Sequence, residues 1–350
     1  MFRLYEKARS AFRHPVTQQT RKIGLRRLTN AAVAKLEQKL IRPRPWGWPI
    51  TAVIEPTNIC NLQCPLCPTG VRKPGRKKGM LSWDLLKKFT DELGPYLWEV
   101  ELNNWGESTL HHQLPEIIAS LKGYGIHVSL SSNLVQAKPE ILRGLITSGL
   151  DYLVISTDGA SPETYAQYRR GGNFQEVCDH VQQLVALKKE LAAANPFVSM
   201  KFLVFKHNQH EMKEFQNLAW RLGADRVQFT QPYIEKEVRK QWASDLPEFN
   251  RYASSEYGET GIAPCHWLWY GVTLNWDGTI SPCCGGNSYH PELDFGSILD
   301  NTFREIWWNK HYQAARSRFN LRTRPSVDFK VACDDCDYLK AYFQHHRTQP

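Results

Sequence analysis

The sequence predicts an α/β fold built on a parallel sheet with helices outside it. Six apolar segments of strand length alternate with segments of helical periodicity between residues 50 and 230. This alternation is typical of β/α units, and apolar strands indicate a sheet that is covered on both faces. Cysteines and polar residues follow several of these strands. Because functional groups in such folds gather at the carboxyl ends of strands, we expect the site at that edge.

The expected elements follow one another in a regular order. The strands are expected at residues 50–55, 100–104, 127–132, 152–157, 198–205 and 226–230, and the helices at 82–93, 114–124, 139–148, 174–194 and 211–222. Ser82 stands where an N-cap residue belongs. Beyond residue 260 the pattern predicts a β-hairpin over 272–283, turning at Asp277-Gly278, and a helix over 298–318. The parallel body is therefore followed by a small α+β extension.

The chain begins with a basic arm. Residues 1–45 hold twelve Lys or Arg and two acidic residues, a net charge of +10, whereas the whole chain carries +9. Two helices are expected here, at 2–13 and 20–41. The second helix has an apolar stripe at helical spacing, formed by Leu25, Leu28, Ala32, Leu36 and Leu40.

Two hypotheses fit this arm. In the first, it lies on an anionic membrane surface, and the basic loop 72–78 meets the phosphate of a lipid-linked substrate. In the second, the leucines pack on the body, and the basic side chains of the arm and the loop are merely solvated. Because the basic excess is confined to the arm, no nucleic-acid partner is expected.

Composition bounds the class of protein. With 350 residues, 42% hydrophobic and 23% charged, the chain is globular. No apolar run reaches the roughly 18 residues that span a bilayer, and no secretory signal is present. Nine cysteines without an export signal favour metal ligation in a reducing compartment over a disulfide scaffold. We therefore expect a cytoplasmic protein that contacts a membrane, if at all, through its arm.

Three cysteines, Cys60, Cys64 and Cys67, form a triad directly after the first expected strand. Three thiolates cannot fill the four positions of a tetrahedral zinc site. They can hold three irons of a [4Fe–4S] cluster and leave the fourth iron open. The alternatives are a zinc site completed by a distant residue, or buried structural thiols.

The triad spacing C-x3-C-x2-C in a loop after a strand resembles that of the radical S-adenosylmethionine (radical SAM) superfamily. The resemblance implies a partial (β/α)6 barrel in which S-adenosylmethionine (SAM) chelates the open iron. Reductive cleavage of SAM, with an electron donor such as flavodoxin or ferredoxin, yields a 5′-deoxyadenosyl radical that abstracts a substrate hydrogen. Leu66 departs from the family, since many members place an aromatic residue there against the adenine, although leucine can pack on that ring.

The segment after the second strand resembles the Gly-Gly-Glu segment of the family. Trp105 replaces its first glycine, so the match depends on Gly106 and Glu107. The resemblance implies that these two residues hold the ammonium group of SAM, and a carboxylate near a cation is sound chemistry. The alternative is an ordinary strand-to-helix turn.

Two later positions also resemble cofactor-binding sites of the family. Ser131 and Asn133 follow the third strand, where residues meet the ribose or carboxylate of SAM. Asp158 and either Arg169 or Arg170 match a segment that meets the ribose, the carboxylate or the substrate. Turn and helix-start chemistry is the alternative in both places.

A second set of cysteines lies near the C-terminus. Its spacing resembles the SPASM/Twitch extension that binds auxiliary iron–sulfur clusters. No cysteine follows the last one, so the shorter, Twitch-like form is expected, with one auxiliary [4Fe–4S] cluster held by Cys265, Cys283, Cys333 and Cys336. Four thiolates could also hold zinc. Cys284 is spare, and it is an alternative ligand, a packing residue or a hydrogen-atom donor to a substrate radical.

Three parts are expected: an arm over 1–45, a radical SAM barrel over 46–235 and a SPASM/Twitch-like domain over 236–350. The single-cluster form is similar to enzymes that oxidise or epimerise a hydroxyl carbon of a sugar or aminocyclitol. We therefore expect a small-molecule substrate, namely a sugar, a polyol or a lipid-linked saccharide. The alternatives are a maturase of a ribosomally made peptide, whose leader-binding domain would exceed the 45-residue arm, and a catalytically inert iron–sulfur protein.

Overall fold

One curved sheet organises the molecule. The computed structural model describes residues 24–252, 262–285, 289–321 and 329–347. Nine strands follow the order β6-β5-β4-β3-β2-β1-β7-β8-β9. Their bounds are β1 Thr51–Ile54, β2 Glu99–Leu102, β3 His127–Ser132, β4 Tyr152–Ser156, β5 Phe197–Leu203, β6 Arg226–Thr230, β7 Gly271–Leu274, β8 Thr279–Ser281 and β9 Gly296–Ser297. The first seven strands pair in parallel, and β8 and β9 are antiparallel.

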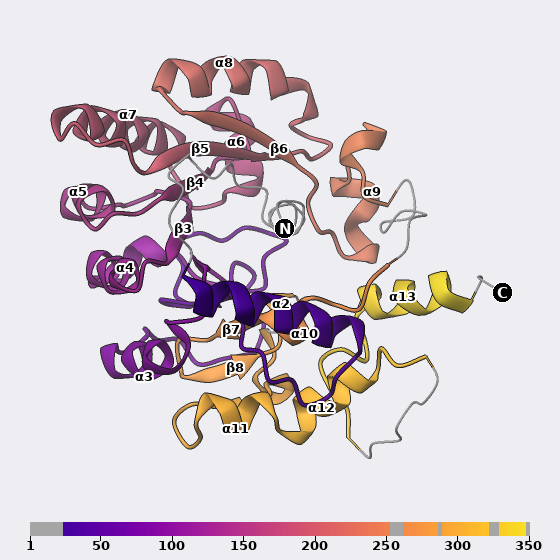
Figure 1. Cartoon of the computed structure of the whole chain (residues 1–350). Coiled ribbons are helices and arrows are strands. Elements are labelled where there is room, and N and C mark those ends of the chain that lie inside the picture. Colours follow the sequence, from indigo (N-terminus) through magenta and orange to yellow (C-terminus); the bar gives the residue numbers. More distant parts are fainter. Residues whose placement is uncertain (1–23, 253–261, 286–288, 322–328, 348–350) are drawn as a thin grey trace.

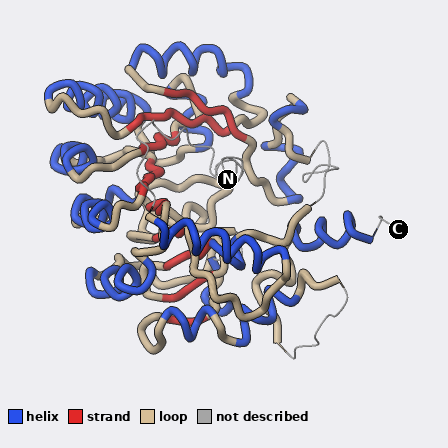
Figure 2. Tube along the Cα trace, viewed as in Figure 1, coloured by secondary structure: helices blue, strands red, loops and turns tan. Residues whose placement is uncertain are grey.

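The α/β class and the six β/α units are confirmed. Helices α3, α4, α5, α7 and α8 lie along the outer side of the arc that the strands form (Figure 1), and Figure 2 shows this arc in red. The α-helices of the body and the C-terminal region are α3 Trp83–Leu93, α4 Leu114–Gly123, α5 Pro139–Thr147, α6 Pro162–Tyr168, α7 Phe174–Glu190, α8 Met212–Leu222, α9 Arg239–Trp242, α10 Trp267–Tyr270, α11 Phe303–Trp307, α12 Lys310–Ser317 and α13 Asp337–Arg347. The Ser82 side chain accepts from the Leu85 N–H and caps α3, as expected.

The two faces of the strands differ in polarity. Residues such as Val100, Leu130 and Met200 are fully buried in the core that the strands share with the helices. Alternate positions, including Glu101 and Lys201, face the inside of the arc. The expectation of apolar strands thus holds for the helix-covered face, while the concave face carries charge.

The C-terminal region differs from expectation in two ways. Strand β7 does begin the expected hairpin, but it also pairs in parallel with β1 and extends the sheet of the body. The single helix expected over 298–318 is two helices. Thr302 and Glu305 form a capping box that begins α11, and the Asn309 side chain accepts two backbone N–H groups that begin α12. The boundaries after residues 45 and 235 stay predictions.

Helix α2 (Leu25–Lys39) docks on the body through its polar face. The Asn30 amide exchanges two hydrogen bonds with the Trp48 backbone, and the Glu37 carboxylate accepts the N–H groups of Trp46 and Gly47. The apolar stripe instead faces outward, with Leu25 77%, Leu36 56% and Leu40 67% exposed. The hypothesis that these leucines pack on the body is therefore wrong.

The first expected helix, over 2–13, lies outside the described residues. Among the helices that are described, none combines the length and the apolar character needed to cross a bilayer.

Candidate functional site

The triad lies in the loop that leaves the carboxyl end of β1. Burial raises the pKa of Cys60 to about 12, and the nearby charges of Glu107, Cys64 and Cys67 act in the same direction. The Leu62 N–H points at the Cys60 sulfur at 3.5 Å. Burial also raises the pKa of Cys64, so Cys60 and Cys64 need a cation-rich partner to hold them as thiolates. The donor set therefore fits an iron–sulfur cluster.

Gly106 and Glu107 connect the triad loop to the ends of β2 and β3. A Cβ atom on Gly106 would lie 2.0 Å from the Thr57 carbonyl oxygen, so only glycine permits this approach. The buried Glu107 carboxylate accepts hydrogen bonds from the hydroxyls of Thr109 and Ser132, both at 2.7 Å, and from the Asn133 N–H, also at 2.7 Å. Its contact with the ammonium of SAM stays a proposal, because these neutral donors already occupy much of the carboxylate.

The two expected residues after β3 differ in their surroundings. The Asn133 amide nitrogen donates to the Asn61 side chain at 2.9 Å and lies 4.0 Å from the Cys60 sulfur. Asn133 is therefore part of the triad site. Ser131 is half-buried on the concave face, and among the described residues no hydrogen bond of its hydroxyl is present. Ser132, which the sequence analysis passed over, is the β3 residue that holds Glu107.

Asp158 and Arg169 form an ion pair beside the triad. Asp158 is fully buried at φ +60°, and its Oδ2 lies 2.5 Å from the Arg169 Nη2. Its other oxygen accepts the Leu203 N–H at 2.6 Å. The Arg169 Nη1 lies 4.0 Å from the Cys64 sulfur, and this cation lowers the pKa of Cys64 against the larger, opposing effect of burial. Asp158 thus orients Arg169 toward the triad. Within the described ranges, the contact of Arg170 with the triad loop is its backbone oxygen, which accepts the Gln63 N–H.

The structure also brings together the second cysteine set, Cys265, Cys283, Cys333 and Cys336. Burial is the main cause that raises the pKa of Cys333, and the charges of Cys283, Cys265 and Cys336 act in the same direction. Among the described residues, no group of three or more His, Cys, Asp or Glu is arranged to hold a single metal ion. Tetrahedral zinc needs its sulfurs roughly 3.8 Å apart, given Zn–S bonds of about 2.3 Å. Four thiols supply the ligand set of an auxiliary iron–sulfur cluster as well as that of zinc.

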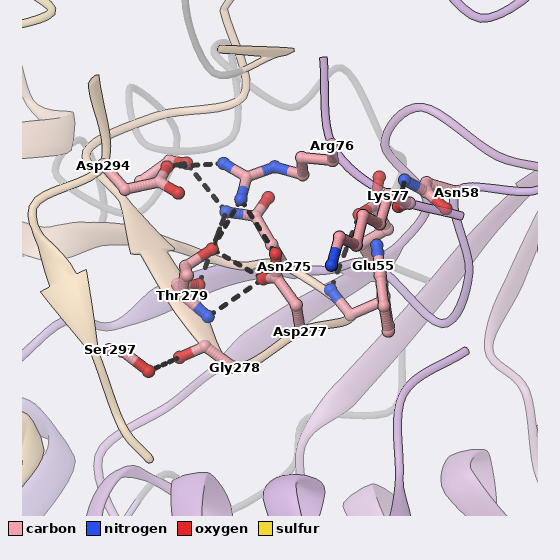
Figure 3. Close-up of polar contacts among 12 residues, drawn as sticks. Glu55, Asn58, Arg76, Lys77, Asn275, Asp277, Gly278, Thr279, Asp294 and Ser297 are labelled. Atoms are coloured by element: carbon pink, nitrogen blue, oxygen red, sulfur yellow. Dashed lines mark hydrogen bonds and ion pairs between the residues drawn. The ribbon is translucent and has the colours of Figure 1, made fainter. Parts of the chain in front are cut away.

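A buried arginine joins the triad loop to the β7–β8 hairpin (Figure 3). The Arg76 guanidinium lies 2.5 Å from the Asp294 Oδ1 and 3.2 Å from the Asp277 Oδ2, and it donates to the Thr279 hydroxyl at 2.7 Å. Burial raises the pKa of the nearby Glu55 to about 7, although N–H groups and Arg76 oppose the rise. Arg76 is thus committed to the fold and does not serve as an anion clamp.

Three groups on or near the concave face were not grouped by the sequence analysis. Glu101 on β2 and Lys201 on β5 are within electrostatic reach of each other but form no ion pair in the described part of the chain. Burial raises the pKa of Glu101 and lowers that of Lys201. Cys284 is exposed and within electrostatic reach of Glu101 and Cys283. The alternation of side chains along a strand could have identified Glu101 and Lys201, since both occupy positions that face the concave side of the sheet.

The structure brings together two sets of cysteines whose thiols suit iron–sulfur ligation, and comparisons with known proteins agree. The radical SAM superfamily profile matches residues 54–219, and the SPASM iron–sulfur cluster-binding domain matches 265–337. The chain therefore carries a radical SAM domain and a C-terminal SPASM domain. These families imply a SAM-binding [4Fe–4S] cluster, SAM itself and auxiliary iron–sulfur ligation, and both cysteine sets fit these groups.

Relatives with assigned activities cover most of the chain. It is 22% identical over 327 residues to a PqqA peptide cyclase of Ruegeria pomeroyi, covering 86% of this chain and 83% of the relative. It is 25% identical to an AdoMet-dependent heme synthase of Methanosarcina barkeri, covering 85% and 89%. Among solved structures, Streptococcus suis SuiB bound to SAM superposes with a TM-score of 0.61 at 14% identity, over 97% of this chain and 82% of that chain. SuiB bound to its precursor peptide SuiA gives 0.57 at 13% identity, over 96% and 81%.

Proposed function

We propose that this protein is a radical SAM enzyme that modifies a peptide. The observation that carries the proposal is the match to the Ruegeria PqqA peptide cyclase, which extends over 86% of this chain. SuiB, whose fold this chain shares, has been solved with a precursor peptide. These relatives favour a peptide over the sugar or aminocyclitol that the sequence predicts, and they give no preference for a dehydrogenase or epimerase type.

The residues of the triad site bind the cluster and orient SAM beside it. When bound, the cluster and SAM supply a 5′-deoxyadenosyl radical. Cys60, Cys64 and Cys67 hold the cluster, and Arg169 places a fixed cation beside Cys64, where it offsets negative charge and suits the carboxylate of SAM. Asp158 keeps Arg169 in this orientation.

The substrate lies against the concave face. Lys201 and Glu101 present opposite charges that do not pair with each other in the described residues. Asn103 donates to the Glu101 carboxylate at 2.7 Å, but neither Glu101 nor Lys201 has an ion-pair partner among the described residues. A ligand that supplies complementary charged or polar groups to both is therefore favoured. A peptide offers carbonyl, amide and charged side-chain groups for this purpose. Cys284 lies on the side of the second cysteine set and is the candidate hydrogen-atom donor.

Isotope transfer tests the substrate class. Cells are grown in deuterated medium, and their peptide and small-metabolite fractions are incubated separately, without air, with reconstituted enzyme, SAM and reduced flavodoxin. Deuterium in the 5′-deoxyadenosine from the peptide fraction is expected. Label from the small-metabolite fraction alone would favour the sugar reading. Cleavage of SAM without label from either fraction would contradict both.

The role of Cys284 has a matched control. Cys284→Ala should still form 5′-deoxyadenosine but lose any product that gains a hydrogen from solvent. Cys178→Ala, at a buried position in α7, should keep that product. Equal solvent deuterium in the products of both variants would remove Cys284 from the reaction.

A further inference from the structure

The outward face of α2 combines apolar and basic side chains. Leu25, Leu36 and Leu40 are 77%, 56% and 67% exposed, and Leu28 and Val33 are each 37% exposed. The opposite side of the helix holds its buried residues, Asn30, Ala34, Glu37 and Gln38. An amphipathic helix of a globular protein usually does the reverse and buries its apolar stripe. This helix therefore presents to its surroundings the face that would normally meet a core.

The polar contacts of α2 fix this orientation. The Arg27 guanidinium donates to the carbonyls of Gly94, Tyr124 and Gly125. The Asn30 and Glu37 side chains satisfy backbone groups of residues 46–48. Rotating the helix to bury its leucines would break these bonds and leave Glu37 without them. The exposed leucines are thus a stable property of the fold.

The sequence on either side of these leucines is mainly basic. Glu37 is the only acidic residue of α2, and it is 3% exposed. Lys39 and Arg44 are exposed, and the 23 residues that precede Gly24 add six Lys or Arg against one Glu in the sequence. Trp46 is also exposed, beneath the Arg42 guanidinium at 3.8 Å. Leucine, tryptophan and a surplus of Lys and Arg are the composition of helices that lie in a membrane interface.

We propose that the outward face of α2 is a docking surface for an anionic lipid bilayer. The leucines enter the boundary of the acyl chains, and the basic residues meet the anionic headgroups. A second copy of the chain is a poorer occupant, because a two-fold interface would set the same basic residues against each other. The proposal is independent of the proposed function.

The position of α2 sets the orientation on the bilayer. Arg27 and Asn30 bind carbonyls that precede β2, β3 and β1, so the helix lies at the amino ends of these strands. The triad lies at the carboxyl end of β1. A bilayer on α2 would therefore leave the triad facing away from the lipid. The expected lipid-linked saccharide loses its geometric support, since its phosphate would have to reach the opposite end of the barrel.

Co-sedimentation of the full chain with vesicles tests the proposal. Vesicles of phosphatidylcholine and phosphatidylglycerol, about three to one, are compared with pure phosphatidylcholine at low and high salt. We expect binding to the anionic vesicles only, weakened by salt. Leu36→Glu with Leu40→Glu should lower the affinity at least about tenfold, which corresponds to about 1.4 kcal/mol. Both positions are exposed, so the fold should persist, and SAM cleavage should be unchanged.

Leu299→Glu is the matched control, since Leu299 is 61% exposed on the segment before α11. It should bind vesicles as the wild type does. An equal loss of binding in this control would overturn the proposal, as would a wild-type chain that ignores anionic vesicles at low salt. A dimer that the double substitution dissociates, without any vesicle binding, would assign the face to a second copy instead.

Discussion

Arg76→Met tests whether one buried cation holds the triad loop to the C-terminal hairpin. The Arg76 side chain is 2% exposed, and its partner Asp294 is 7% exposed. Removing the cation leaves Asp294 buried without its counter-ion, and breaking a buried pair in this way costs roughly 3–5 kcal/mol. Burial already raises the pKa of Asp294, and Arg76 opposes the rise. The variant should therefore take up a proton at Asp294, which places the expected loss near the lower end of that range.

The assay is urea unfolding of the full chain, followed by tryptophan fluorescence without air. Arg76→Lys should lose an intermediate amount, because an ammonium keeps the charge but cannot contact Asp294, Asp277 and Thr279 in the same fork geometry. Lys77→Met is the control, and at this exposed neighbour the change should stay within about 0.5 kcal/mol. A loss below about 1 kcal/mol in Arg76→Met would refute the view that this residue holds the two regions together.

Three further predictions follow from the site. Because the pKa of Glu55 is raised to about 7, its stabilisation is complete below about pH 4.5 and is lost as the pH rises through 7. Thermal unfolding of Glu55→Gln should therefore show a flatter pH dependence, by on the order of 3 kcal/mol, and identical profiles would contradict this. Glu107→Gln should weaken SAM binding in equilibrium dialysis by roughly 1.5–3 kcal/mol with iron retained, and unchanged affinity would move the role of the acid elsewhere. Reconstituted protein should hold about eight irons. Changing Cys60, Cys64 and Cys67 together to alanine should leave about four irons and no SAM cleavage. An unchanged iron count in this variant would contradict the assignment of the triad as cluster ligands.

Local pattern was enough to predict much of the fold. The strands at His127–Ser132 and Arg226–Thr230 occur where the apolar runs place them. The hairpin turns at Gly278, which adopts φ +82° as its turn requires. In these places the signal and the structure depend on residues that are neighbours in the sequence.

The features that the sequence could not predict depend on contacts between residues that are far apart in the chain. Periodicity showed that α2 has two faces, but the docked face was chosen by the backbone groups of residues 46–48, which a polar side chain can satisfy and a leucine cannot. Arg76 finds Asp294 at a separation of 218 residues. The family resemblance identified Glu107 as a site carboxylate. Its hydrogen bonds to Ser132 and Asn133 could not be predicted, because they form only when β2 and β3 pair in the sheet.

The pairing of β1 with β7 has a consequence for synthesis of the chain. β1 is covered on one edge by β2 but on the other by a strand that follows Ile54 by 217 residues. At about 5–20 residues per second, the ribosome needs about ten to forty seconds to deliver that partner. Until then, the strand that leads into the triad has an open apolar edge, which is a template for aggregation. An interior strand of the finished sheet is thus among the last to gain both of its neighbours, and the nascent chain needs protection at the place where its iron will be loaded.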